Sequence, residues 1–191
     1  MDQQQFLNLM TELGARKEGH FKLSSGLHSD TYFQCAQVLQ YPELALELGK
    51  EIASKFDANQ FDLVVAPAMG ALLLGNEVAR ALGRRYVFTE RVDGEMTLRR
   101  GFEINKGEKV LMVEDVVTRG TSTLEVIDVI EKAGGVVEGL ACLVNRTGGN
   151  VELPLPLHSL AAVDVVTWDP DSCPLCKSGS EAIKPGSRGN V

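Results

Sequence analysis

Short and almost wholly apolar runs, separated by stretches of helical pattern, constrain the fold of this chain more than any other feature. The apolar runs lie at 61–68, 110–116, 136–146 and 160–168. Helical patterns fill 71–82, which closes at Gly83, and 123–135, which ends in a glycine pair. Continuously apolar strands that alternate with helices are typical of a parallel sheet covered on both faces. We therefore predict an α/β fold with a central, mostly parallel sheet flanked by helices.

The remaining segments fit one domain of 191 residues, a length that supports a single well-formed core. Residues 19–33 are rich in glycine and serine with aromatics between them, and they predict a turn-rich ligand segment or a short hairpin. The other expected elements are helices at 3–13 and 42–56, a strand at 84–90, a polar loop with extended flanks at 91–108 and a surface extension from 169 to 191.

Composition excludes several classes of protein. Apolar residues make up 44% of the chain and charged residues 24%, a balance typical of soluble globular proteins. The net charge of -7 argues against a general nucleic-acid surface, which needs clustered Lys and Arg. No run is apolar for long enough to cross a bilayer, the first residues do not form a secretory signal, and four cysteines do not make a disulfide framework. We expect a cytoplasmic protein that binds neither membrane nor nucleic acid.

The segment 110–122, VLMVEDVVTRGTS, carries the chemistry. Glu114 and Asp115 stand where the buried strand leaves the sheet, and ligands of open α/β sheets bind outside the carboxyl ends of strands. The helix that follows offers unpaired N–H groups and the positive end of its dipole to a phosphate. Gly120 lets the backbone turn closely around such an anion.

Hydroxyl groups and acids complete the pattern of a sugar-phosphate site. Thr118, Thr121 and Ser122 add donors, while the two acids could accept hydrogen bonds from ribose hydroxyls and stabilise positive charge on the sugar. Taken singly, Thr121 or Ser122 is more simply a helix N-cap and the acids are solvated. The combination favours function, and no G-x-x-x-x-G-K-[ST] or G-x-G-x-x-G motif competes with it.

This segment resembles the phosphoribosyl-pyrophosphate (PRPP) signature of the type I phosphoribosyltransferases. Its surroundings are similar to the orotate phosphoribosyltransferases over nearly the whole chain: GHFKLSSGLHSDTYF (19–33), VVAPAMGA (64–71), LVNR (143–146), CPLC (173–176) and KPGSR (184–188). The resemblance implies the type I phosphoribosyltransferase fold as a single domain over 1–191. A small N-terminal hood lies within residues 1–40, and residues 169–191 form a C-terminal extension.

The resemblance also implies roles for the residues that match. PRPP binding is assigned to Glu114, Asp115, Val116, Val117, Thr118, Arg119, Gly120, Thr121 and Ser122, of which the two acids act on the ribose as catalytic residues. The pyrophosphate loop is assigned to Ala68, Met69 and Gly70. Orotate binding is assigned to Thr118, Arg146, Ser25, Gly26, Tyr32 and Phe33, with the planar fork of Arg146 on the orotate carboxylate. Without the resemblance, Arg146 would be a solvated strand-end arginine and the aromatics would be core residues.

Three basic positions of the family differ here. Ser24 stands where many members have a lysine, the pyrophosphate loop has no lysine, and 91–98 lacks the usual Lys-x-His pair. We expect Arg91 to replace a basic pyrophosphate contact, with Arg99 or Arg100 sharing the work.

The implied reaction joins orotate N1 to ribose C1 with loss of pyrophosphate, forming orotidine 5′-monophosphate in de novo pyrimidine synthesis. Mg²⁺ is expected to bind through PRPP, without a dedicated protein cage. The resemblance further implies a homodimer whose mobile loop reaches the neighbouring site. Two alternatives stay open: transfer to another base, such as a purine or uracil, and a PRPP- or nucleotide-sensing regulator.

Cys173 and Cys176 have the spacing of a metal-binding pair, but structural zinc normally needs four ligands. The remaining candidates, Cys35, Cys142, His20, His28 and His158, are scattered apart from this pair in the sequence, so we expect a non-ligand role for Cys173 and Cys176. His20 and His28 lie near the expected hood, and we expect no catalytic role for them because most lone histidines are structural or solvated. A metal shared by two such pairs across a dimer is the alternative.

Overall fold

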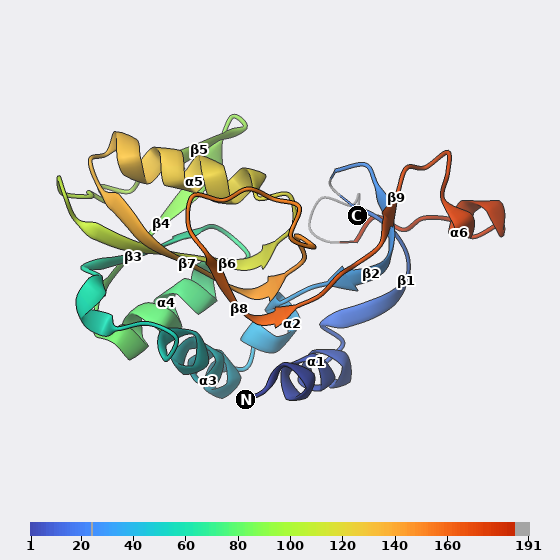
Figure 1. Cartoon of the computed structure of the whole chain (residues 1–191), viewed down its shortest axis with the longest axis horizontal. Coiled ribbons are helices and arrows are strands. Elements are labelled where there is room, and N and C mark those ends of the chain that lie inside the picture. Colours follow the sequence, from blue (N-terminus) through green and yellow to red (C-terminus); the bar gives the residue numbers. More distant parts are fainter. Residues whose placement is uncertain (24, 186–191) are drawn as a thin grey trace.

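The computed structural model describes residues 1–23 and 25–185, which form a six-stranded sheet and a smaller three-stranded sheet (Figure 1). The large sheet has the order β5-β4-β3-β6-β7-β8. Its strands are β3 (Leu63–Pro67), β4 (Arg85–Val92), β5 (Glu95–Leu98), β6 (Lys109–Val117), β7 (Val136–Asn145) and β8 (Leu157–Ala162). All neighbours are parallel except β4 and β5, which form an antiparallel hairpin. The prediction of a mostly parallel sheet is confirmed.

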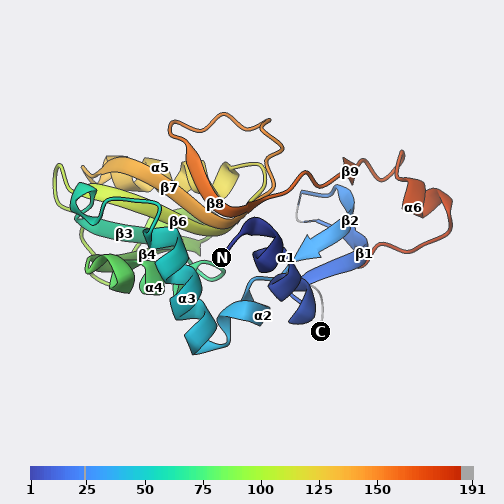
Figure 2. The ribbon, with the colours of Figure 1, turned by 60° about the horizontal axis from the view of Figure 1, so that its bottom comes forward.

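Helices cover both faces of the large sheet. The helices of this part of the molecule are α1 (Gln3–Glu12), α2 (Ala36–Leu39), α3 (Pro42–Ala53), α4 (Leu72–Leu82) and α5 (Thr121–Lys132), with a 3-10 turn at Ala58–Gln60. The short helix α6 (Pro174–Lys177) lies in the C-terminal extension, away from this sheet (Figure 1). In Figures 1 and 2, α5 lies on one face of the sheet, whereas α3 and α4 lie on the other. No helix in the described residues is long and apolar enough to span a membrane.

Alternate residues of the central strands enter two separate cores. Leu111 and Val113 of β6 pack in the cluster that includes α1, α3 and α4, whereas Val110 and Met112 pack with α5. Successive side chains of a strand point to opposite faces, so β6 can be apolar throughout only because both faces are covered. This is the physical basis of the continuous apolar runs in the sequence.

The smaller sheet, here called the hood sheet, consists of β1 (Arg16–Lys22), β2 (His28–Phe33) and β9 (Thr167–Trp168). Of the two interpretations of 19–33, the hairpin is the one observed, because β1 and β2 pair antiparallel. The strand predicted at 160–168 is wrong as a single element. Its first part belongs to β8, whose partner β7 ends opposite Ala162, and its last two residues cross to the hood sheet and pair with β2.

The predicted loop at 91–108 is partly a hairpin. β4 and β5 are joined by Asp93 and Gly94, which both have positive φ (51° and 90°), as a tight hairpin turn requires. Residues 99–108 contain no helix or strand, in agreement with the predicted loop.

The C-terminal extension packs against the hood. Ile183 N donates to His20 O (2.8 Å) and Lys22 N donates to Ile183 O (2.8 Å), so the tail runs beside β1. The extension brings Cys173 and Cys176 to His20 and His28, and the expectation that these histidines lie apart from the cysteines is therefore wrong. Ser24 and the last three residues of the KPGSR motif lie outside the described residues.

Candidate functional site

A cleft of about 1240 Å³ lies between the carboxyl ends of β6 and β7 and the hood sheet. Most predicted site residues line it: Ser25, Tyr32, Phe33, Arg91, Glu114, Asp115, Val116, Val117, Thr118, Arg119, Gly120, Thr121, Ser122 and Arg146. Gly26, Ala68, Met69 and Gly70 do not line it. The edge of the parallel sheet and the hood sheet therefore bring together residues from four distant parts of the sequence.

The loop between β6 and α5 has the geometry of an anion site. Gly120 is the N-cap of α5 in a left-handed conformation (φ 70°), and no side chain caps the helix. A Cβ at Gly120 would lie 2.7 Å from Val151 Cγ1, so the turn requires glycine for both space and conformation. The alternative of Thr121 or Ser122 as N-cap is wrong, because both belong to the first turn. The uncapped end leaves its N–H groups free for an anion.

Two acids, the buried Glu114 and the half-buried Asp115, lie beside this loop. Glu114 is only 7% exposed, and neither it nor Asp115 forms an ion pair within residues 1–23 and 25–185. Burial, followed by repulsion from Asp115, raises the pKa of Glu114 well above its usual value. Burial also raises the pKa of Asp115, although Val116 N donates to its Oδ1 (2.9 Å). Unneutralised acids in this position are suited to bind hydroxyl groups or a cation.

We expect these acids to make the free protein less stable as pH rises. A carboxyl whose pKa is higher in the folded than in the unfolded state binds more protons when folded, so the free energy of unfolding falls once pH exceeds the unfolded value. Urea unfolding between about pH 5 and pH 8 measures this slope. Glu114→Gln should flatten it and stabilise the free protein near neutral pH by on the order of 1–3 kcal/mol. Equal slopes in both proteins would contradict the prediction.

The turn after β3 touches one of the acids. Ala68 N donates to Thr89 O (2.7 Å), which ties the turn to β4. A Cβ at Gly70 would lie 2.6 Å from Asp115 Oδ2, so only glycine allows this approach. Met69 is 80% exposed. The loop at 68–70 therefore meets the cleft through the Asp115 carboxylate.

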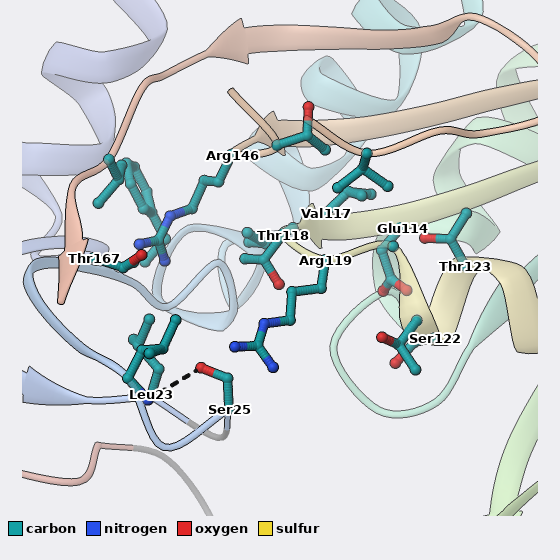
Figure 3. Close-up of a pocket in the computed structure, with 18 of the residues that line it drawn as sticks. Leu23, Ser25, Glu114, Val117, Thr118, Arg119, Ser122, Thr123, Arg146 and Thr167 are labelled. Atoms are coloured by element: carbon teal, nitrogen blue, oxygen red, sulfur yellow. Dashed lines mark hydrogen bonds between the residues drawn. The ribbon is translucent and has the colours of Figure 1, made fainter. Parts of the chain in front are cut away.

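Arg146 follows β7 and points into the hood side of the cleft (Figure 3). Its Nη2 donates to Thr31 O (3.3 Å), and its guanidinium lies 5.6 Å from the centre of the Phe33 ring. Nε is buried without a hydrogen-bond partner in the described residues, and burial lowers the pKa of this side chain. A half-buried guanidinium whose buried Nε is unused favours an anionic group of a ligand.

The hood contributes aromatic and hydroxyl groups. Tyr32 and Phe33 come from β2, and the pKa of Tyr32 is raised by burial and then by the charge of Asp115. Ser25 stands in the turn between β1 and β2, where its Oγ accepts from Leu27 N (3.4 Å; Figure 3). Gly26 provides the positive φ (86°) of that turn. The hood therefore contributes two aromatic residues to the lining of the cleft, one of which, Phe33, also belongs to the buried core.

The arginines differ in their placement. Arg91 lines the cleft while its guanidinium forms an ion pair with Glu125 and donates to Gly94 O (2.6 Å). Arg119 extends from its loop into the cleft (Figure 3). Arg99 and Arg100 instead pair with Glu90 and do not line the cleft of this chain.

Lys22 and Lys184 are lining residues that sequence reasoning did not single out. Lys184 belongs to the KPGSR motif, which carried the resemblance without an assigned role. No local pattern indicates that residues so far apart in the chain meet at one cleft, because the tail reaches it only by pairing with β1.

Comparisons with known proteins find close relatives. A family model described as a phosphoribosyl transferase domain matches residues 34–154. The orotate phosphoribosyltransferase of Desulforamulus reducens is 49% identical over 188 residues, which cover 98% of each chain. That of Chlorobium phaeobacteroides is 49% identical over 182 residues, or 95% of this chain and 94% of its own.

Solved structures agree with this likeness. Orotate phosphoribosyltransferase from Aeropyrum pernix has a TM-score of 0.66 at 26% identity, covering 82% of this chain and 92% of its own. Adenine phosphoribosyltransferase from Rhodothermus marinus has a TM-score of 0.64 at 22% identity, covering 84% and 99%. The second likeness concerns the fold alone.

Proposed function

We propose that this chain, which belongs to the phosphoribosyltransferase family and within it to the orotate phosphoribosyltransferases, transfers the phosphoribosyl group of PRPP to N1 of orotate. The products are orotidine 5′-monophosphate and pyrophosphate. One observation carries the proposal: an uncapped helix end, the buried Glu114 with the half-buried Asp115, and an arginine with unused donors face one cleft.

The loop from Thr118 to Ser122 would hold the 5′-phosphate of PRPP. Free N–H groups at the start of α5 donate to phosphate oxygens, and the hydroxyls of Thr118, Thr121 and Ser122 add further donors. Val116 and Val117, the last two residues of β6, would contribute backbone where the strand meets this loop. Because backbone groups do most of the binding, Arg119 serves as an auxiliary charge.

Glu114 and Asp115 would hold the ribose and act as catalytic residues. They accept hydrogen bonds from the 2′- and 3′-hydroxyls. As the bond from C1 to pyrophosphate breaks and orotate N1 bonds to C1, positive charge develops on the sugar. Two negative groups placed in advance stabilise this charge at little reorganisation cost.

Mg²⁺ would bind through PRPP, and the donor set fits such an ion. Glu114 is buried and Asp115 half-buried, neither has a cationic partner in the described residues, and Mg²⁺ prefers oxygen ligands and substrate phosphates. When bound, Mg²⁺ neutralises the charge of the leaving pyrophosphate.

Arg146 would bind the orotate carboxylate. A planar guanidinium donates two parallel hydrogen bonds to a carboxylate, and the free Nε is one of the donors available. Thr118 contributes its hydroxyl group, while the hood residues Ser25, Gly26, Tyr32 and Phe33 cover the base and exclude water. Neutral purines lack the carboxylate that this arginine requires.

Arg91 and the loop Ala68, Met69 and Gly70 would bind pyrophosphate. The loop lies against Asp115, and Arg91 stands at the cleft with its charge shared with Glu125. Arg91 would take over the contact to the leaving pyrophosphate from the lysine and histidine that this chain lacks at 91–98.

Gly70→Ala is expected to lower kcat/KM for PRPP about 100-fold, because the new methyl group must displace the Asp115 carboxylate. Steady-state kinetics measures this change, and thermal unfolding checks that the variant folds. A well-folded variant with normal activity would contradict the role of this approach.

We also propose a cytoplasmic homodimer of single-domain chains over 1–191 that binds neither membrane nor nucleic acid. The acidic net charge of -7 and four free cysteines support the compartment and the lack of nucleic acid. Arg99 and Arg100, which do not line the cleft of their own chain, would serve the neighbouring site. Sedimentation analysis tests the dimer, and a monomer active at all concentrations would contradict it.

The decisive test combines binding and turnover. Calorimetry with Mg²⁺ present should detect PRPP binding, and orotate absorbance should fall when PRPP is added. Release of pyrophosphate with a purine or uracil but not with orotate would replace the proposed base. PRPP binding without turnover of any base would instead favour a regulator.

A further inference from the structure

Four metal-ligating side chains meet behind the hood, outside the cleft. They are His20 of β1, His28 of β2, Cys173, and Cys176 of α6, and their ligand atoms all lie within 4.8 Å of one another. His20, His28 and Cys173 are buried, and Cys176 is exposed. In both views α6 lies beyond the β1–β2 hairpin, at the end of the molecule opposite β3 and α4 (Figures 1 and 2). We propose that these four residues bind one structural Zn²⁺ ion, independently of the proposed transfer reaction.

The distances are those of a tetrahedral site. Zn–N and Zn–S bonds of about 2.1 and 2.3 Å place tetrahedral neighbours about 3.4 Å apart for two nitrogens and about 3.6 Å for nitrogen and sulfur. Here His20 Nε2 lies 2.9 Å from His28 Nδ1, 3.5 Å from Cys173 Sγ and 3.8 Å from Cys176 Sγ. Cys176 Sγ lies 3.3 Å from His28 Nδ1. Each separation is within about half an ångström of its tetrahedral value.

Hydrogen bonding alone does not account for this arrangement. A neutral imidazole nitrogen has either one proton or one lone pair, yet His20 Nε2 is close to three polar atoms at once. A central cation uses the lone pairs of all four groups together. Two thiolates and two neutral imidazoles suit Zn²⁺, and C-x₂-C is a usual spacing for one pair of its ligands.

A neighbouring residue orients His20. Its Nδ1 lies 3.0 Å from the carbonyl oxygen of Ser180, which accepts the Nδ1 proton. This hydrogen bond leaves the Nε2 lone pair directed at the cluster. Metal-bound histidines typically donate the proton of the ring nitrogen that does not bind the metal to an oxygen of the protein, as His20 Nδ1 does here. Two cysteines without a metal would not need a histidine oriented in this way.

At this location the ion would stabilise the hood sheet. The hood sheet has only three strands, one of them two residues long, and few of its side chains belong to the main cores. Small units of this kind usually need a metal or disulfides to stay folded. The ion would join the β1–β2 hairpin to the extension, and so hold the tail that carries Lys184 to the cleft.

The test is metal content and spectroscopy of the full, untagged chain kept reduced. We expect about one Zn²⁺ per chain after dialysis, or after adding Zn²⁺ to chelated protein. Co²⁺ should give the intense visible bands and thiolate charge-transfer absorption of a tetrahedral site. Cys176→Ser and His28→Asn should lose most of the bound metal and change this spectrum. The matched controls Cys35→Ala and His158→Asn, outside the cluster, should retain both.

Several results would overturn the proposal: no uptake of Zn²⁺ or Co²⁺ at micromolar concentration, a six-coordinate Co²⁺ spectrum, or equal metal loss in the controls. A Cys173–Cys176 disulfide that persists under reducing conditions without metal would do the same. If a variant fails to fold, the Co²⁺ spectrum of the wild-type chain still shows whether a tetrahedral thiolate site is present. As a second measurement, removal of the ion by a chelator should speed trypsin cleavage at Lys177 several-fold in the wild-type chain. An unchanged cleavage rate would contradict the claim that the ion holds the extension to the hood.

Discussion

Asp115→Asn is expected to lower kcat about 100- to 1000-fold, the usual effect of removing a group that stabilises transition-state charge. The carboxylate lies at the end of β6, against the backbone of Gly70, and no cation in the described residues neutralises it. Asparagine has the same shape, so it fits this space, but it carries no negative charge to oppose the charge on the sugar. Steady-state kinetics with PRPP, orotate and Mg²⁺ measures the change.

The activity of Arg119→Ala and the thermal stability of Asp115→Asn show whether the loss of turnover comes from the missing carboxylate charge. Arg119→Ala should lower kcat less than about tenfold, because backbone N–H groups at the start of α5 do most of the phosphate binding. Burial raises the pKa of Asp115, so asparagine should leave thermal stability equal or higher, and loss of activity would not reflect unfolding. Equal turnover of Asp115→Asn and the wild-type enzyme would refute the ribose assignment.

Arg146→Ala should lower kcat/KM for orotate about 100-fold or more, while the affinity for PRPP changes little. Truncating one partner of a buried charge pair typically costs 2–5 kcal/mol, roughly 30-fold or more. Arg146 is the cleft residue whose Nε is buried without a partner in the described part of the chain, so its donors are available to a carboxylate. Kinetics with each substrate varied in turn, together with PRPP calorimetry, separates the two effects.

Arg146→Lys and Arg80→Ala serve as controls for this prediction. Lysine keeps the charge but loses the planar fork, so it should recover only part of the orotate affinity. Arg80 is an exposed residue of α4 paired with Glu77 (3.5 Å), and its removal should leave both substrates unaffected. An Arg146→Ala enzyme that loses PRPP and orotate affinity equally would place this arginine elsewhere in the mechanism.

Local sequence determined the large sheet and the anion loop. The apolar runs at 61–68, 110–116 and 136–146 became β3, β6 and β7, because a strand covered on both faces needs apolar side chains throughout. The turn at Gly120 follows equally from local chemistry, since its positive φ and the nearby side chain of Val151 admit only glycine. The fold class was predicted from these segments and the family from the resemblance of motifs along nearly the whole chain, and both are confirmed.

Features that depend on pairing between distant segments were decided only by the tertiary structure. The apolar run at 160–168 gives no sign that it divides between two sheets, because both halves have strand composition and only the available partner separates them. The meeting of His20 and His28 with Cys173 and Cys176 likewise depends on the tail returning to β1. Local propensity acts over a few residues, whereas these contacts join segments more than a hundred residues apart, so no pattern within either segment specifies them.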